Sequence, residues 1–168
     1  MLRTQIRKAI LMREKEPLSH EEYLHLKEEV LRSANDFHTL YTSIPKKLFT
    51  DIQPRRTFYG PLPNTPYAMY AHVNEVTSYY MGEISVHTEL HPLLYENRKQ
   101  AFLQLEEQLD YLHCPLHQGK HGEEWTLRKV LRRFLWHDAI HAKALYRLGT
   151  RLWSPDIVAD PFYFHGWK

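Results

Sequence analysis

Residues 131–147 read LRRFLWHDAIHAKALYR, a run of helix formers in which apolar residues recur at steps of three and four. This period predicts an amphipathic helix from residue 127 to about 150, with Thr126 as its N-cap. Steps of 4, 3, 4, 3 and 4 residues define the predicted inward-facing seam: Val130, Phe134, His137, His141, Ala144 and Leu148. This helix therefore places two histidines in the expected core.

An earlier helix is predicted from the capping-box pattern that runs from Ser19 to Glu22. The helix should stop near Pro45, because proline cannot continue it. Its predicted apolar face comprises Tyr23, Leu26, Val30, Phe37 and Leu40.

Two more helices are predicted between these. One starts at Pro66, with Asn64 or Thr65 as N-cap, and weakens near Gly82. Its inward stripe comprises Met69, His72, Val76 and Tyr79. The other begins near Pro92. Its apolar face comprises Leu94, Ala101, Phe102, Leu105, Leu109 and Leu112.

The pattern of these four helices, without period-2 strands or internal repeats, predicts one all-α domain over residues 1–168, a four-helix bundle. Five prolines within residues 44–66 predict a long crossover between the first and second helices. Residues 1–17 are expected to add a short N-terminal helix. The tail, residues 151–168, should pack across the bundle or against a partner subunit through its aromatic residues: Phe162, Tyr163, Phe164 and Trp167.

The composition excludes several function classes. The chain carries 22 basic and 20 acidic residues, a net charge of +2, so no nucleic-acid interface is expected. A single cysteine, Cys114, excludes an internal disulfide and fits a reducing compartment. The first residues lack a signal-peptide pattern, and no apolar run is long enough for a membrane span. The sequence thus predicts a cytoplasmic protein without membrane or nucleic-acid partners.

His137 and His141 stand four residues apart and project from one face of their helix. Three interpretations are open: a metal-binding pair, two core histidines with hydrogen-bond partners, or a variant of the zinc-protease motif HExxH. The protease interpretation is disfavoured, because Asp138 replaces the glutamate of that motif and no sheet is predicted. Two neighbouring imidazoles in a core need two buried polar partners, which favours metal ligation.

His72, on the inward stripe of the second helix, is the candidate third ligand. The alternative is a core histidine bonded to Tyr79 or Glu75. Three histidines suit zinc or nickel and leave a coordination position open for water or substrate. Glu75 and Asp138 are candidate catalytic residues, either as partners of the ligand rings or as a base for metal-bound water. Asp138 is otherwise expected to be a solvated helix residue.

Other histidines are expected to have lesser roles. The loop at 113–121 contains four potential metal ligands, in irregular spacing that favours adventitious binding: His113, Cys114, His117 and His121. His87 and His91 lie at a helix junction and are expected on the surface. A ferritin-like di-iron site is not expected, because the paired Glu-x-x-His motifs are absent.

The histidine within YAHVNEVTSYY (residues 70–80), joined to H-x-x-x-H within TLRKVLRRFLWHDAIHAKALYR (residues 126–147), resembles the DinB/YfiT-like superfamily. Members are metal-binding four-helix bundles related to thiol-dependent S-transferases. By motif position, the resemblance implies metal ligation by His72, His137 and His141. It also implies zinc or nickel as the metal, a homodimer, and either transfer of low-molecular-weight thiols or metal-dependent hydrolysis.

Two functions are therefore expected as alternatives. The leading one is a metal-dependent transferase or hydrolase that acts on a small molecule, such as a low-molecular-weight thiol, at the open coordination position. The alternative is a non-catalytic helical bundle that acts through a protein–protein interface, with its metal structural or absent. The aromatic tail motivates this alternative.

Overall fold

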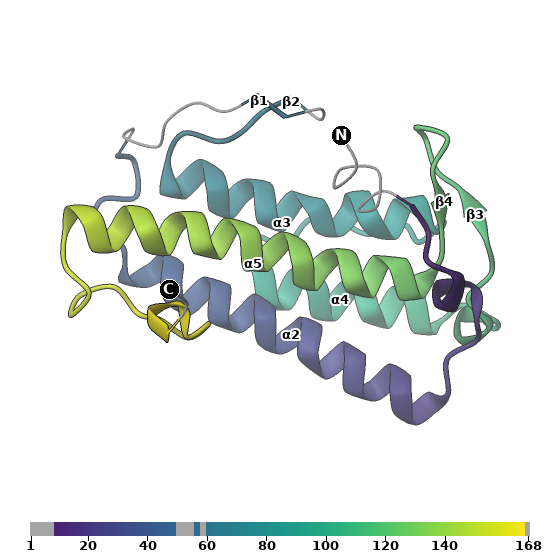
Figure 1. Ribbon diagram of the computed structural model, residues 1–168. Helices are drawn as coiled ribbons and strands as arrows, with labels where there is room; N and C mark the ends of the chain where they lie inside the picture. Colours follow the sequence, from purple (N-terminus) through teal and green to yellow (C-terminus); the bar gives the residue numbers. More distant parts are fainter. Residues whose placement is uncertain (1–8, 50–55, 58–59, 167–168) are drawn as a thin grey trace.

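The computed structural model describes residues 9–49, 56–57 and 60–166, and these are mostly helical (Figure 1). Most of the described chain belongs to α2 (His20–Ser43), α3 (Pro66–Glu83), α4 (Leu94–Glu106) and α5 (Leu127–Leu152). Short 3-10 helices are η1 (Met12–Lys15), η2 (Tyr111–His113) and η3 (Phe164–Gly166). Two antiparallel pairs of two-residue strands join β1 (Arg56–Thr57) to β2 (Gly60–Pro61) and β3 (His117–Gln118) to β4 (Glu124–Trp125). The described chain is thus all-α in class, as predicted.

The helix boundaries follow local chemistry. Side-chain oxygens of Ser19, Thr65 and Thr126 each accept a hydrogen bond from the backbone amide three residues later. Each bond satisfies an amide that has no partner within its own helix. α2 ends at Ser43, two residues before Pro45, since the residue before a proline is disfavoured in the helical conformation. The predicted caps of α2, α3 and α5 are confirmed.

The four long helices lie alongside one another (Figure 1). α2 packs against α4 and α5, α3 packs against the same two helices, and α2 and α3 share little contact. α2 and α3 therefore occupy a diagonal, and the connector at 44–65 links helices that are not neighbours. This arrangement sets α3 directly against α5, the two helices that carry the candidate histidines.

Two apolar clusters fill the interior. The first lies toward the β3–β4 end, and its largest members are Tyr23, Tyr80, Phe102, Trp125 and Phe134. The second lies toward the opposite end and includes Phe37, Tyr70, Leu94, Leu145 and Val158. On α5 the boundary between them falls between Phe134 and Ala142, the interval that contains the histidine pair.

Two predicted core positions are wrong. Ala144 is exposed and Leu145 is buried in its place, because a straight α-helix drifts away from a strict 3.5-residue period over several turns. Leu109 is 99% exposed, because α4 ends at Glu106 and the chain turns away from the core. On α4 and α5 these errors lie near the C-terminal ends of the predicted faces.

The inward face of α3 is rotated relative to the prediction. Val73, Thr77 and Tyr80 are buried, whereas His72 and Val76 are only half-buried. His72 therefore lies at the border between the core face of α3 and its surface. A ligand at such a border connects a buried site to solvent.

The described residues near the two ends of the chain form short elements. Within residues 1–17, where a short helix is predicted, the described part contains the 3-10 helix η1, and residues 1–8 lie outside the described residues. The tail packs on its own chain: Phe164 is buried, and its ring stacks on Phe162 with centroids 5.4 Å apart. Trp167 lies outside the described residues. None of the helices in the described ranges is long and apolar enough for a transmembrane segment.

Candidate metal centre

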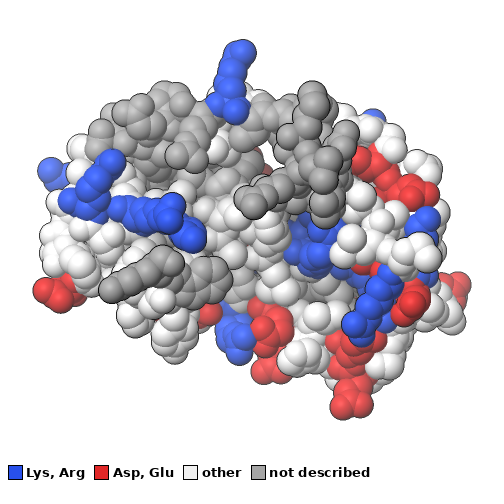
Figure 2. Space-filling view, viewed as in Figure 1, with Lys and Arg blue, Asp and Glu red and all other residues white. Residues whose placement is uncertain are grey.

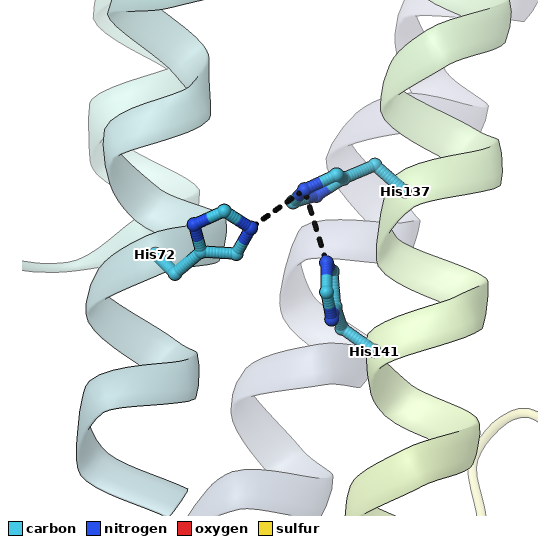
Figure 3. Close-up of side chains that lie close together, drawn as sticks. All are labelled: His72, His137 and His141. Atoms are coloured by element: carbon cyan, nitrogen blue, oxygen red, sulfur yellow. Dashed lines mark hydrogen bonds between the residues drawn. The ribbon is translucent and has the colours of Figure 1, made fainter. Parts of the chain in front are cut away.

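Three histidine side chains converge between α3 and α5 (Figure 3). Nε2 of His137 lies 3.1 Å from Nε2 of His72 and 3.1 Å from Nε2 of His141. One ligand atom from each ring falls within 4.8 Å of the others. The structure thus brings together all three predicted ligands. It unites a pair on one helix with a residue 65 positions away in the sequence.

Helix geometry accounts for the placement of His137 and His141. Residues four apart on α5 face the same direction, so His137 and His141 point together toward α3. His72 reaches them because α3 lies against α5. His137 and His141 are 6% and 5% exposed, so both rings are almost fully removed from water.

Burial keeps the three imidazoles neutral. It lowers the pKa of His137 well below its ordinary value, and the neighbouring His141, His72, Arg98 and Arg133 lower that pKa further. Burial and, secondarily, His72 lower the pKa of His141 to about 3. Burial also lowers the pKa of His72, against an opposing effect of the Glu75 charge. A neutral imidazole offers the lone pair that a metal ion requires.

Hydrogen bonding alone does not satisfy this arrangement. Nε2 of His137 has two Nε2 neighbours, yet a neutral imidazole nitrogen carries either one proton or one lone pair. It can therefore form one good hydrogen bond to these neighbours, and the other contact stays unsatisfied. Nδ1 of His137 is buried and has no hydrogen-bond partner among the described residues. The interpretation as well-satisfied core histidines is accordingly weak.

A cation among the three nitrogens would resolve the conflict at the Nε2 atoms, while Nδ1 of His137 would still have no partner among the described residues. Each Nε2 would then direct its lone pair at the ion, and the protons would reside on the Nδ1 atoms. Bonds of 2.0–2.1 Å at tetrahedral angles separate two nitrogen ligands by about 3.3 Å. The 3.1 Å spacings lie close to that value. The three histidines therefore lie close enough to hold one metal ion between α3 and α5.

Asp138 faces away from the histidines. Both of its oxygens are engaged by the guanidinium of Arg98, at 2.6 Å for Nη2 to Oδ1, and Oδ2 also accepts from the hydroxyl of Ser33 at 2.8 Å. Both members of the ion pair are fully buried. Successive helix residues point about 100° apart, which aims Asp138 at α2 and α4 while His137 faces α3. The expectation of a solvated Asp138 is wrong, and its carboxylate is committed to Arg98.

Glu75 acts on the triad through its charge. It is exposed, and its charge raises the pKa of His72. It stands one helix turn after His72 on α3, at the open border of the site. Glu75 therefore remains the better placed of the two predicted acidic partners.

Sequence reasoning missed the buried arginines around the site. Arg98 is fully buried and lies over the ring of Phe134 at 4.6 Å, although it was not predicted in the core of α4. Its signal was its position four residues after Leu94, on the apolar stripe that the sequence defines. Arg133 is also buried, four residues before His137 on the same face of α5.

The loop at 113–121 does not assemble a second site. His113 pairs with Asp110 at 3.6 Å, and Nδ1 of His117 lies 3.4 Å from the hydroxyl of Ser85. Cys114 is buried, and burial raises the pKa of its thiol, which disfavours the thiolate that both metals and nucleophilic chemistry need. Across the described parts of the chain, the histidine triad is the one grouping with three ligands within reach of a single ion.

The chain was also compared with known proteins. No family model, no curated protein and no solved structure matches it.

Proposed function

We propose that this protein is a metal-dependent enzyme with a DinB/YfiT-like four-helix bundle, in which His72, His137 and His141 hold zinc or nickel. One observation carries the proposal: the Nε2 atoms of three neutral histidines, two of them buried, converge, and hydrogen bonds among them cannot satisfy all three. The diagonal placement of α2 and α3 supports the bundle with a long crossover. The H-x-x-x-H pair together with a cross-helix histidine supports the family resemblance.

The site suits hydrolysis or thiol transfer. Three protein ligands leave a coordination position for an exogenous group, and a bound divalent metal lowers the pKa of a water or thiol there. The half-buried His72 supports an open position near the border of α3, where Glu75 could accept a proton from the incoming group. The apolar clusters on both sides exclude bulk water from His137 and His141.

A small-molecule substrate fits the surface better than a polyanion. On the face shown in Figure 2, basic and acidic side chains adjoin at the right-hand end, whereas mainly basic side chains are seen at the left-hand end. The basic side chains on this face are therefore not continued into the long positive stripe that nucleic-acid backbones require. From the family resemblance, the proposal retains a low-molecular-weight thiol as the leading substrate class and a homodimer, with the cytoplasmic location that the sequence predicts.

The non-catalytic alternative gains little from the tail. Phe162 and Phe164 stack on each other, and Phe164 also contacts Tyr146 with ring centroids 5.7 Å apart. These aromatic side chains contact their own chain. Among the described tail residues, Tyr163 and Ile157 are 71% and 52% exposed and still favour a partner surface.

Metal titration of protein prepared without a polyhistidine tag tests the proposal. We expect apo protein to bind one equivalent of Co²⁺ with the visible absorption of a low-symmetry, four- or five-coordinate site. The His137→Ala/His141→Ala variant should lose this absorption while it keeps its helical circular dichroism. Unchanged cobalt binding by the variant, or none by the wild-type protein, would overturn the assignment.

A further inference from the structure

Arg98, Asp138 and Ser33 form a buried polar cluster among the four long helices. Nη2 of Arg98 donates to Oδ1 of Asp138 at 2.6 Å, Nη1 donates to Oδ2, and the Ser33 hydroxyl donates to Oδ2 at 2.8 Å. Arg98 and Asp138 are fully buried, and Ser33 is 7% exposed. The cluster therefore joins α2, α4 and α5 at the residue that directly follows His137.

The Arg98 side chain links two helices that share little other contact. α4 and α5 lie across a diagonal of the four long helices, as α2 and α3 do. On α5 the guanidinium meets two residues one helix turn apart: its fork engages Asp138, and its central carbon lies 4.6 Å from the ring centre of Phe134. These two contacts on one stripe of α5 define which side of this helix faces α4.

Stability alone is a poor explanation for the Arg98–Asp138 pair. Removal of two charges from water costs about as much as their attraction returns, so a well-packed apolar pair is often equally stable or more stable. Nε of Arg98 is in addition buried without a hydrogen-bond partner among the described residues. An ion pair supplies direction, which apolar contacts lack, because the planar guanidinium fork and the carboxylate meet in a fixed arrangement.

Direction matters here because His137 and Asp138 move together when α5 rotates. His137 and His141 extend from α5 toward His72 on α3 (Figure 3). A side-chain nitrogen lies about 6 Å from its helix axis, so a rotation of α5 by about 10° shifts it by about 1 Å. Metal–ligand distances tolerate only about 0.2 Å. A small rotation would therefore take both rings away from an ion shared with His72.

We propose that Arg98 and Asp138 are positioning residues of the metal centre, which fix the rotation of α5 so that His137 and His141 meet His72. This inference rests on the proposed metal function. Arg98 and Asp138 act from the side of α5 that faces α2 and α4, so they set the geometry of the ligands without contact with the ion. Ser33 holds the same carboxylate from α2 and completes the arrangement.

A paired replacement separates positioning from stability. In Arg98→Met/Asp138→Leu, apolar side chains replace the ion pair, so the urea midpoint and the helical circular dichroism should stay near the wild-type values. We expect the Co²⁺ affinity of this variant, measured by chelator competition, to fall by about tenfold or more, as for outer partners of metal sites. The visible absorption of the bound Co²⁺ should change as well. A structural role alone predicts wild-type cobalt binding in any variant of wild-type stability.

Single variants grade the effect. Arg98→Lys keeps the charge and loses the fork, so it should change the cobalt absorption more than Asp138→Asn, which keeps a hydrogen-bond acceptor for Arg98. Leu105→Ala is the matched control, because it removes buried core contacts of α4 two helix turns beyond Arg98. It should lower the urea midpoint and still bind cobalt with the wild-type affinity and absorption.

The outcomes are distinct. Wild-type cobalt affinity and absorption in the folded double variant would overturn the inference. If the double variant does not fold, Arg98→Lys and Asp138→Asn decide: unchanged cobalt absorption in both overturns the inference, and altered absorption that Leu105→Ala does not share supports it. Absence of cobalt binding by the wild-type protein would instead overturn the metal assignment itself.

Discussion

Two histidine-rich parts of this chain end in different arrangements. On α5 and α3, His72, His137 and His141 bring their ligand atoms within 4.8 Å of one another. The segment at 113–121 has as many histidines and a cysteine in addition, yet it brings no three ligands together in the structure as described. A high density of ligand-type residues is therefore a poor indicator of a metal site.

The difference lies in the backbone that carries the side chains. A helix repeats its direction every few residues, so a four-residue spacing aims two rings at one point. In the loop, Cys114 adopts a left-handed conformation with φ of 49°, and the residues around it turn toward different neighbours. His113 faces Asp110, His117 faces Ser85, and Cys114 is buried in the first apolar cluster. A regular helix thus directs potential metal ligands to one point, whereas the irregular loop directs them to different neighbours.

The largest effect should come from removal of a triad ligand. We expect His72→Ala to weaken Co²⁺ or Zn²⁺ binding by more than 100-fold, which exceeds the 10–100-fold effect typical of outer partners of a metal site. The control is the triple variant His113→Ala/His117→Ala/His121→Ala. It removes three loop histidines and should leave the metal affinity unchanged. Competitive titration with a chromophoric chelator measures both. A larger loss in the loop variant would reverse the comparison.

The next effect concerns the buried ion pair on the opposite side of α5. Asp138→Ala leaves the Arg98 guanidinium buried without its counter-charge, so the free energy of unfolding should fall by about 3–5 kcal/mol. Asp110→Ala in the loop removes a carboxylate that is 81% exposed and should change that free energy by about 0.5 kcal/mol or less. Urea denaturation monitored by circular dichroism gives both values. Similar losses would show that the Arg98 pair contributes no more than a surface contact.

The pH dependence of the free energy of unfolding of the metal-free protein should also differ between the triad histidines and the loop histidines. His141 titrates near its ordinary pKa of 6.5 when unfolded, and burial lowers that pKa to about 3 in the folded state. The unfolded chain therefore binds more protons between these values, so stability is complete above pH 6.5 and declines as the pH falls below it. For His141 alone, the free energy of unfolding should drop by about 1.7 kcal/mol between pH 6.5 and 5, because the slope approaches its limit of about 1.36 kcal/mol per pH unit only below the unfolded pKa.

Urea denaturation of apo protein across this range measures the decline. The His137→Ala/His141→Ala variant should lose most of the slope. The triple loop variant should retain most of it, with a smaller reduction because burial lowers the pKa of His117 as well. A slope that follows the loop histidines instead would contradict the assignment of the pH dependence to the triad.

The smallest effect is expected at the border of the site. Glu75→Gln removes a negative charge that favours a cation near His72, and metal affinity should fall by about tenfold or less, the lower end for an outer partner. Glu107→Gln, an equal change of charge at the end of α4 beside the loop, is the control and should have no effect. The same chelator competition applies. No difference between the two variants would remove Glu75 from the site.

Much of the fold was predictable because its determinants are local. The caps at Ser19, Thr65 and Thr126 act within three residues. The helical repeat of apolar residues on α5 is maintained along a 26-residue helix. The His137–His141 pair follows from the same periodicity. These features depend on neighbours in the chain, which the sequence lists in order.

Other features needed the packed structure. The prediction that Ala144 is buried failed because the small difference between 3.5 and 3.6 residues per turn accumulates along α5. The prediction that Asp138 is solvated was wrong because its partner, Arg98, lies 40 residues away on another helix. Arg133 and Tyr80 were not singled out, because their proximity depends on how α3 lies against α5.

The sequence by itself determined four helices, most of their ends and two histidines aimed in one direction, since helical periodicity and capping operate over one or two turns. Only the tertiary structure decided that His72 meets this pair at 3.1 Å and that Asp138 belongs to Arg98. It also decided that the loop histidines stay apart. The physical reason is that contacts between helices depend on their relative rotation, which is set by the packing of two whole clusters rather than by any short stretch of chain.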